Sequence, residues 1–219
     1  MQKPSFDTSG LTFKSRVVPV ITLTHAQQAV PLAHALLAGG IDVMEITLRH
    51  STALSSIEAV ARSVPGMQVG AGTVTHAYQV SQIRDAGATF ALSPGLTPAI
   101  HEAVKEHAMP FIPGAMTPSE VMQAWDWGYQ TVKLFPAAQA GGIAMLKAMA
   151  GPLGEMRFCP TGGVSLSNLA DYLKQPNVSM VGGSWMVPLN LIESAQWTEV
   201  TRLAAEASAV AQSTVQHPG

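Results

Sequence analysis

The chain has 219 residues, of which 47% are hydrophobic and 12% are charged, and its formal net charge is −2. Soluble domains usually carry roughly 25% charged residues, so the low fraction here indicates much buried surface and favours a subunit interface. No basic block stands out, and the sequence therefore lacks the electrostatic footprint of a nucleic-acid-binding protein. Cys159 is the only cysteine, which excludes an intrachain disulfide and favours a reducing compartment.

No segment of the sequence predicts export or membrane insertion. Residues 1–14 are polar and lack the apolar core of a signal peptide. No uninterrupted apolar run approaches the roughly 18 residues that a membrane span needs. No low-complexity segment or linker divides the chain, so we expect a single domain over residues 1–219. Together these features predict a cytoplasmic protein without membrane contact.

Strands and helices alternate along the whole chain after a short N-terminal extension. Apolar and β-branched runs bounded by glycine and proline predict strands at 17–23, 42–48, 68–74, 89–92, 110–113, 129–136, 157–160 and 178–181. The segments that follow these runs predict helices at 26–37, 53–63, 76–86, 97–107, 117–127, 141–150, 165–173 and 195–211.

This alternation sets the expected fold class, which is α/β. Strict strand–helix alternation argues for a parallel sheet. Eight such units in one domain predict a closed (β/α)₈ TIM barrel, here with a short N-terminal extension and a C-terminal helix. An open, doubly wound sheet is the alternative, but no Gly-x-Gly-x-x-Gly follows the first strand to support it.

The sixth predicted strand carries a single lysine. Side chains alternate between the two faces of a strand, so Thr131, Lys133 and Phe135 share one face. Both faces of a parallel strand in an α/β protein are normally apolar, and a lysine there must find a partner or lose its proton. A neutral amine in a protected site is the nucleophile that Schiff-base chemistry needs. The alternative is a lysine at the strand mouth that extends to water.

The second predicted strand alternates between apolar and polar side chains. Met44 and Ile46 lie on one face, and Glu45 and Arg49 lie on the other. In a barrel the apolar face meets the helices, which directs a carboxylate and a guanidinium inward. An edge strand with a solvated face would show the same alternation, but a barrel has no edges. Arg49 at the mouth suits bidentate recognition of a carboxylate, and the deeper Glu45 is a candidate for proton transfer.

The ends of the third and fourth predicted strands add two further candidates. Thr73 follows Gly70-Ala71-Gly72, whose small side chains leave room above the barrel core. Tight packing between strands would also explain these glycines. Pro94 lies in Ser93-Pro94-Gly95, which predicts a tight turn that shapes the pocket wall.

Two glycine-rich loops follow the last two predicted strands. The first contains Thr161-Gly162-Gly163 and the second contains Gly182-Gly183-Ser184. In (β/α)₈ barrels the loops after strands seven and eight form the recurrent phosphate site. Glycines let backbone N–H groups approach a phosphate closely. Two glycine pairs in these two loops therefore predict phosphate binding.

The seven histidines do not predict a metal site. They are scattered, and none lies in a ligand spacing with a nearby carboxylate. His50 follows Arg49 directly and is a candidate for the mouth of the site. We therefore expect no metal and no cofactor.

Together these motifs resemble the class I aldolases that cleave 2-keto-3-deoxy-6-phosphogluconate (KDPG) and often act on 4-hydroxy-2-oxoglutarate (KHG). The resemblance spans nearly the whole chain, from residue 17 to residue 185. It is carried by five motifs: Glu45-Ile46-Thr47-Leu48-Arg49, Gly70-Ala71-Gly72-Thr73-Val74, Ser93-Pro94-Gly95, Lys133-Leu134-Phe135-Pro136-Ala137 and Arg157-Phe158-Cys159-Pro160-Thr161-Gly162-Gly163.

The resemblance assigns roles to these residues. It implies that Lys133 forms the Schiff base, that Glu45 moves protons, and that Arg49 and Thr73 hold the pyruvyl carboxylate. The other members of the implied substrate-binding set are Pro94, Phe135, Thr161, Gly162, Gly163, Gly183 and Ser184, with phosphate near the last four. The resemblance also implies a cytoplasmic homotrimer of the Entner–Doudoroff pathway that needs no metal.

The predicted reaction is cleavage of KDPG to pyruvate and glyceraldehyde 3-phosphate, and of KHG to pyruvate and glyoxylate. A barrel isomerase or synthase for a phosphorylated substrate would share the phosphate loops but form no imine with pyruvate. A non-catalytic sugar-phosphate sensor would bind phosphate without turnover. An inward pairing of Glu45 with Lys133 argues against a sensor, because burying opposed charges for binding alone is costly.

Overall fold

The computed structural model describes residue 11 and residues 13–214. The N-terminal extension expected at residues 1–14 lies mostly outside this part of the chain. The strands are β1 Val17–Ile21, β2 Val43–Thr47, β3 Gln68–Gly72, β4 Phe90–Leu92, β5 Phe111–Ile112, β6 Gly114–Ala115, β7 Thr131–Leu134, β8 Arg157–Phe158 and β9 Val181–Gly183. A 3-10 turn, Ala26–Gln28, precedes α1.

The helices follow the strands along the chain. They are α1 Ala29–Ala38, α2 Ala53–Ser63, α3 Tyr78–Asp85, α4 Pro98–Glu106, α5 Pro118–Asp126, α6 Gly142–Ala150, α7 Leu166–Leu173, α8 Leu189–Glu193 and α9 Trp197–Ser213. None of the helices between residues 13 and 214 is both long enough and apolar enough to span a bilayer.

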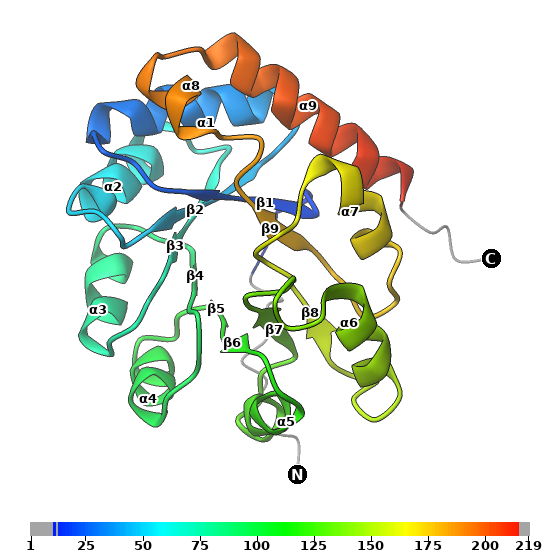
Figure 1. Ribbon diagram of the computed structural model, residues 1–219. Coiled ribbons are helices and arrows are strands. Elements are labelled where there is room, and N and C mark those ends of the chain that lie inside the picture. The colour runs from blue at the N-terminus through cyan, green and yellow to red at the C-terminus, as the bar shows by residue number, and fades with distance from the viewer. Residues whose placement is uncertain (1–10, 12, 215–219) are drawn as a thin grey trace.

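The strands form two parallel sheets. The larger has six strands in the order β5-β4-β3-β2-β1-β9, and the smaller has three in the order β6-β7-β8. Figure 1 shows the larger sheet curled, with helices on its outer side and the smaller sheet between its β5 and β9 ends. The carboxyl ends of all these strands point the same way, so the loops that follow them gather at one end of the molecule.

The expected closed, eight-stranded TIM barrel is wrong. At one seam Pro113 separates β5 from β6, and proline has no N–H to continue a ladder. At the other seam the described residues form no ladder between β8 and β9, and isolated bridges join Phe158 to Val178 and Thr161 to Gly182. The hydrogen-bonded structure is therefore a curled, six-stranded half-barrel with a separate three-stranded sheet, and its class is α/β.

The strand β2 buries both of its faces. All five residues of β2 are buried, and Met44 and Ile46 on its outer face are completely inaccessible. This pattern is typical of parallel strands that are covered by helices. The inner face of β2 carries Glu45 and Thr47, which are also buried. Buried polar side chains such as these need hydrogen-bond or ion-pair partners.

Candidate active site

An ion pair between Glu45 and Lys133 lies inside the curled sheet. Lys133 Nζ is 3.0 Å from Glu45 Oε1 and 3.4 Å from Glu45 Oε2. The exposed fractions of the two side chains are only 6% for the lysine and 1% for the glutamate. The structure therefore brings together, from β7 and β2, the two residues that the sequence predicts to be catalytic. A buried lysine finds a partner here, as its position on the strand required.

The backbone of β3 shapes the space around the carboxylate. Glu45 is level with Gly70 in the β2–β3 register, and Gly72 lies two residues further along. A Cβ atom on Gly72 would overlap Oε1, Cδ and Cγ of Glu45. Since Glu45 is fully buried, its side chain has little room to give way. Glycine at position 72 is therefore needed for the carboxylate to reach Lys133.

The segment that ends β5 and begins β6 holds the backbone of the lysine on one side. The Lys133 N–H donates to the Pro113 carbonyl at 2.7 Å, and Lys133 is level with Gly114 in the β6–β7 register. A Cβ atom on Gly114 would overlap the backbone of Pro94, so the turn after β4 lies directly against this part of the site. The Phe135 ring centroid is 5.6 Å from Lys133 Nζ, within the range of a cation–π contact.

Cys159 forms a wall of the site next to the ion pair. It is completely buried, and its Sγ lies 3.9 Å from Thr161 Oγ1. Burial raises the pKa of the Cys159 thiol to about 12, with a smaller opposing effect from the Lys133 charge. The thiol is therefore neutral at physiological pH and packs as a small apolar group.

Arg49 and Ser184 line one cavity at the carboxyl ends of β1, β2 and β9. The cavity has a volume of about 270 Å³, and its other walls are Val20, Thr22, Val187, Pro188 and Leu189. Arg49 is exposed and makes no hydrogen bond or ion pair with any residue that the structure describes. A free guanidinium at a cavity mouth suits an anionic ligand.

Thr73 lies just beyond the end of β3, in a left-handed conformation with φ of 61°. Positive φ is a genuine outlier for a β-branched residue, and such strain is concentrated at functional sites. The strand ends at Gly72, so simple alternation along the strand does not extend to Thr73. Its half-buried side chain nevertheless lies two residues beyond Ala71, at the site end of the sheet.

The two predicted phosphate loops lie side by side. Thr161 bridges to Gly182, and a Cβ atom on Gly182 would overlap the Thr161 hydroxyl oxygen. Gly162 and Gly163 adopt left-handed backbones with φ of 96° and 80°, which favour glycine. Asn168, in the first turn of α7, holds this loop because its Nδ2 donates to the Gly163 carbonyl at 3.0 Å.

Comparison with known proteins identifies the family. Residues 10–203 match the aldolase family described as KDPG and KHG aldolase. The chain belongs to this family. It is 49% identical over 193 residues to the 2-dehydro-3-deoxy-phosphogluconate aldolase of Dickeya dadantii, which covers 88% of this chain and 91% of that protein. It is 47% identical over 191 residues to the KHG/KDPG aldolase of Escherichia coli K12, covering 87% of this chain and 90% of that protein.

Solved structures agree with this assignment. The KDPG aldolase of Legionella pneumophila, with pyruvate captured at low pH as a covalent carbinolamine, has a TM-score of 0.87 and 44% identity, and the match covers 89% of this chain and 94% of that one. The aldolase of Zymomonas mobilis ZM4 with 3-phosphoglycerate has a TM-score of 0.86 and 40% identity, covering 92% and 95%. As a member of the KDPG and KHG aldolase family, the chain is an aldolase, a carbon–carbon lyase.

Sequence patterns did not indicate every residue that shapes the site. Thr22 in the Arg49 cavity, the Gly72 contact with Glu45 and the Cys159 wall all depend on which strands are neighbours. Strand order is not visible in a periodic pattern. His50, a candidate for the mouth, is exposed, and its Nδ1 lies 3.0 Å from Thr52 Oγ1. It is not among the residues that line the Arg49 cavity.

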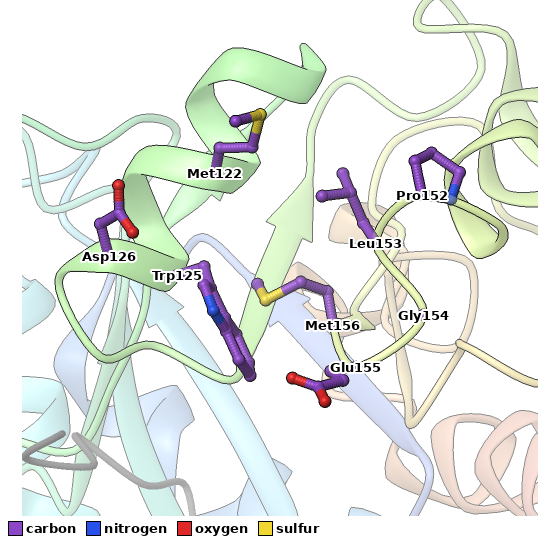
Figure 2. A pocket seen from close by; sticks show the side chains of 8 residues that line it. All are labelled: Met122, Trp125, Asp126, Pro152, Leu153, Gly154, Glu155 and Met156. Atoms are coloured by element: carbon purple, nitrogen blue, oxygen red, sulfur yellow. The ribbon is translucent and has the colours of Figure 1, made fainter. Parts of the chain in front are cut away.

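Another hollow, of about 300 Å³, lies at the opposite end of the strands. Figure 2 shows its walls, which come from the end of α5 and from the segment before β8: Met122, Trp125, Asp126, Pro152, Leu153, Gly154, Glu155 and Met156. Both segments lead into the amino ends of β7 and β8. None of the predicted site residues lines it, so it is separate from the Glu45–Lys133 pair.

Proposed function

We propose that the protein is a Schiff-base-forming class I aldolase that cleaves KDPG to pyruvate and glyceraldehyde 3-phosphate, and KHG to pyruvate and glyoxylate. The observation that carries the proposal is the buried ion pair, with 3.0 Å between Lys133 Nζ and Glu45 Oε1. The related Legionella aldolase holds pyruvate as a covalent carbinolamine, which supports attack by an amine on the ketone carbon. No observation favours an isomerase, a synthase or a sensor.

Imine formation begins with proton transfer within the ion pair. Glu45 takes a proton from the Lys133 ammonium, and the neutral amine adds to the C2 ketone of the substrate to give a carbinolamine. Glu45 then returns the proton to the carbinolamine hydroxyl, which leaves as water. The product is an iminium on Lys133, and Glu45 is again a carboxylate that can act as a base.

Carbon–carbon cleavage uses the iminium as an electron sink. Glu45 removes the proton of the C4 hydroxyl, the C3–C4 bond breaks, and its electron pair moves into the iminium to form an enamine. The aldehyde leaves. Glu45 then donates its proton to C3 of the enamine, and hydrolysis of the resulting iminium releases pyruvate. One carboxylate acting first as base and then as acid predicts a bell-shaped dependence of rate on pH.

The substrate-binding residues have complementary positions for an extended anionic substrate. We propose that Arg49 and Thr73 hold the pyruvyl carboxylate, and that Thr161 lies near the aldehyde end. The phosphate-binding group comprises Gly162, Gly163, Gly183 and Ser184, with Pro94 and Phe135 on the walls. The free guanidinium of Arg49 and the left-handed backbones of the first two glycines support these roles.

Borohydride trapping with pyruvate, followed by peptide mass spectrometry, tests the Schiff base. A reduced pyruvyl adduct on Lys133 is the expected result. Lys133→Arg keeps the positive charge but lacks the nucleophilic amine, so it should form no adduct and have no measurable cleavage activity. Lys147→Arg on α6, whose lysine is exposed, is the matched control and should behave as the unmodified protein. An adduct on another lysine would contradict the proposed site.

We also propose a homotrimer that works in the Entner–Doudoroff pathway. The support is the family membership and the low charged fraction of 12%, which fits buried subunit surface. Light scattering after size exclusion should give three times the chain mass of 23.0 kDa. A mass equal to that of one chain would contradict the trimer without affecting the proposed chemistry.

A further inference from the structure

Thr22 follows β1 and lies in the cavity with Arg49 and Ser184. Val20 is level with Glu45 in the β1–β2 register. Thr22 is two residues further along the same strand direction, toward the mouth. It therefore lies beyond the ion pair, in the cavity whose other polar residues are Arg49 and Ser184.

A chain of two hydroxyl groups determines how Thr22 can hydrogen-bond. Thr47 Oγ1 donates to the Ile21 carbonyl at 2.9 Å. Thr22 Oγ1 lies 2.7 Å from Thr47 Oγ1. A hydroxyl has one proton to donate and two lone pairs to accept. Because the Thr47 proton is used on Ile21, the Thr22 proton must be the one shared between the two hydroxyls.

This arrangement leaves Thr22 only as an acceptor toward the cavity. Thr47 is buried at 1% exposure, so its hydroxyl has no water with which to exchange partners. Arg49, on the same cavity, offers only donors. The cavity thus presents a fixed acceptor next to a cation, and a ligand group that is neutral and carries an O–H proton complements Thr22.

We infer that Thr22 is a specificity-determining residue that accepts a hydrogen bond from the C5 hydroxyl of KDPG. The inference rests on the proposed function. In KDPG this hydroxyl lies between the C3–C4 bond that breaks and the phosphate on C6. Thr22 correspondingly lies in the cavity that contains Ser184 and Val20, and Val20 is level with Glu45 in the β1–β2 register. KHG has a carboxylate carbon at C5 and no such hydroxyl, so Thr22 has nothing to accept from it.

The test compares KDPG with two substrates that lack its C5 hydroxyl. Pyruvate release is measured from KDPG, from its 5-deoxy analogue and from KHG, with the full-length protein and with Thr22→Val and Thr22→Ser. Valine keeps the volume and removes the acceptor, whereas serine keeps the hydroxyl. Thr198→Val, on the exposed surface of α9, is the control for a threonine-to-valine change elsewhere.

Thr22→Val should lower kcat/KM for KDPG by about three- to tenfold, the effect of one hydrogen bond. It should leave kcat/KM for the 5-deoxy analogue and for KHG within about twofold, since neither substrate makes this hydrogen bond. Thr22→Ser should retain the preference for KDPG over its 5-deoxy analogue, and Thr198→Val should change nothing.

Two results would overturn the inference. Equal losses on all three substrates would show that Thr22 supports the strand or Arg49, and unchanged values for KDPG would show that it makes no contact. Borohydride trapping on Lys133 is run with every variant. An unmodified protein that traps no pyruvate and cleaves no substrate would refute the proposed function itself, which is a different outcome from a Thr22 effect.

Discussion

At the scale of single residues, the Glu45–Lys133 pair explains how a charged nucleophile is stored inside an apolar sheet. Two isolated charges at this depth would be strongly destabilising, and their mutual attraction offsets part of the desolvation penalty. The same short distance of 3.0 Å lets a proton move between the two groups. The pairing therefore lowers the cost of burying the two charges, and it is also the starting point of the proposed reaction.

Glu45→Gln should remove the proposed base and acid while leaving the Lys133 amine in place. Glutamine fills the same space but cannot act as a base, and general acid–base catalysis typically contributes about 10²–10⁴-fold to a rate. We expect kcat for KDPG cleavage to fall by about that factor, while slow borohydride trapping of pyruvate on Lys133 persists. Glu106→Gln on the exposed face of α4 is the control. A variant that keeps more than about a tenth of kcat would remove Glu45 from the mechanism.

Gly72→Ala tests whether the backbone of β3 positions the carboxylate. The new methyl group would overlap the Glu45 carboxylate, which has no free space because it is fully buried. We expect the carboxylate to move away from Lys133 and kcat to fall by about 10-fold or more, since small misplacements of catalytic groups are costly. Gly151→Ala, which meets no atom within 4 Å, should retain normal kcat in the same assay.

At the scale of elements, the buried His101 anchors α4 to neighbouring aromatic residues. His101 is 7% exposed, its ring stacks on Trp127 at 4.6 Å, and its Nδ1 lies 3.0 Å from the Tyr129 hydroxyl. Burial lowers the pKa of His101, and the nearby Glu102 carboxylate opposes this effect in part. The imidazole thus connects α4 to the start of β7 in its neutral form.

The His101 pKa predicts how stability depends on pH. The unfolded chain has a histidine pKa of about 6.5, and the folded protein has a lower one. Below about pH 6.5 the unfolded state therefore binds more protons, and the free energy of unfolding decreases as pH falls. Urea unfolding at several pH values measures this dependence. The free energy of unfolding should decrease less steeply with falling pH for His101→Gln than for the unmodified protein. The exposed control His34→Gln should keep the full decrease, and an equal slope for all three proteins would refute the assignment.

Local patterns predicted most elements well, because their signals are local. The helix expected at 53–63 matches α2, and Thr97 and Thr117 cap α4 and α5 immediately before a proline in the first turn. The strand expected at 178–181 is instead β9, Val181–Gly183. The apolar run continues into Gly182 and Gly183, and the hydrogen bonds to β1 decide which of these residues form the strand. The sequence analysis missed β6 and α8, which are short.

The site was predicted to the extent that it depends on strand alternation. Alternation alone directs Glu45 and Lys133 to inner faces, and the structure places them in contact. By contrast, the Thr22–Thr47 hydrogen bond and the left-handed backbone of Thr73 arise from the neighbours of each strand end. Such contacts join segments that are distant in sequence, and no periodicity encodes them.

At the scale of the whole molecule, the sheet is interrupted at two seams rather than closed by continuous ladders. Its β8–β9 seam depends on isolated bridges. Arg16 lies just before β1 and makes hydrogen bonds to the segment that precedes β9. Its Nε donates to the Ser179 carbonyl at 3.0 Å, and its Nη2 donates to the carbonyls of Leu173 and Val178 at 3.1 and 3.0 Å. One guanidinium therefore fastens the end of α7 and the approach to β9 onto the start of the first strand.

Arg16→Lys should weaken the attachment of the end of α7 and of the segment before β9 to the start of β1, while preserving charge. An ammonium lacks the fork of donors that lets one guanidinium reach three carbonyls, and each lost hydrogen bond to a charged group costs about 1.5–3 kcal/mol. We expect the free energy of unfolding in urea to fall by about 2–4 kcal/mol, with the m-value unchanged. Arg62→Lys is the control, at an exposed ion pair with Glu58 on α2. It should change the free energy of unfolding by less than about 0.5 kcal/mol. If the two variants were equally stable, the three hydrogen bonds of Arg16 would contribute little to holding residues 173–179 against the start of β1.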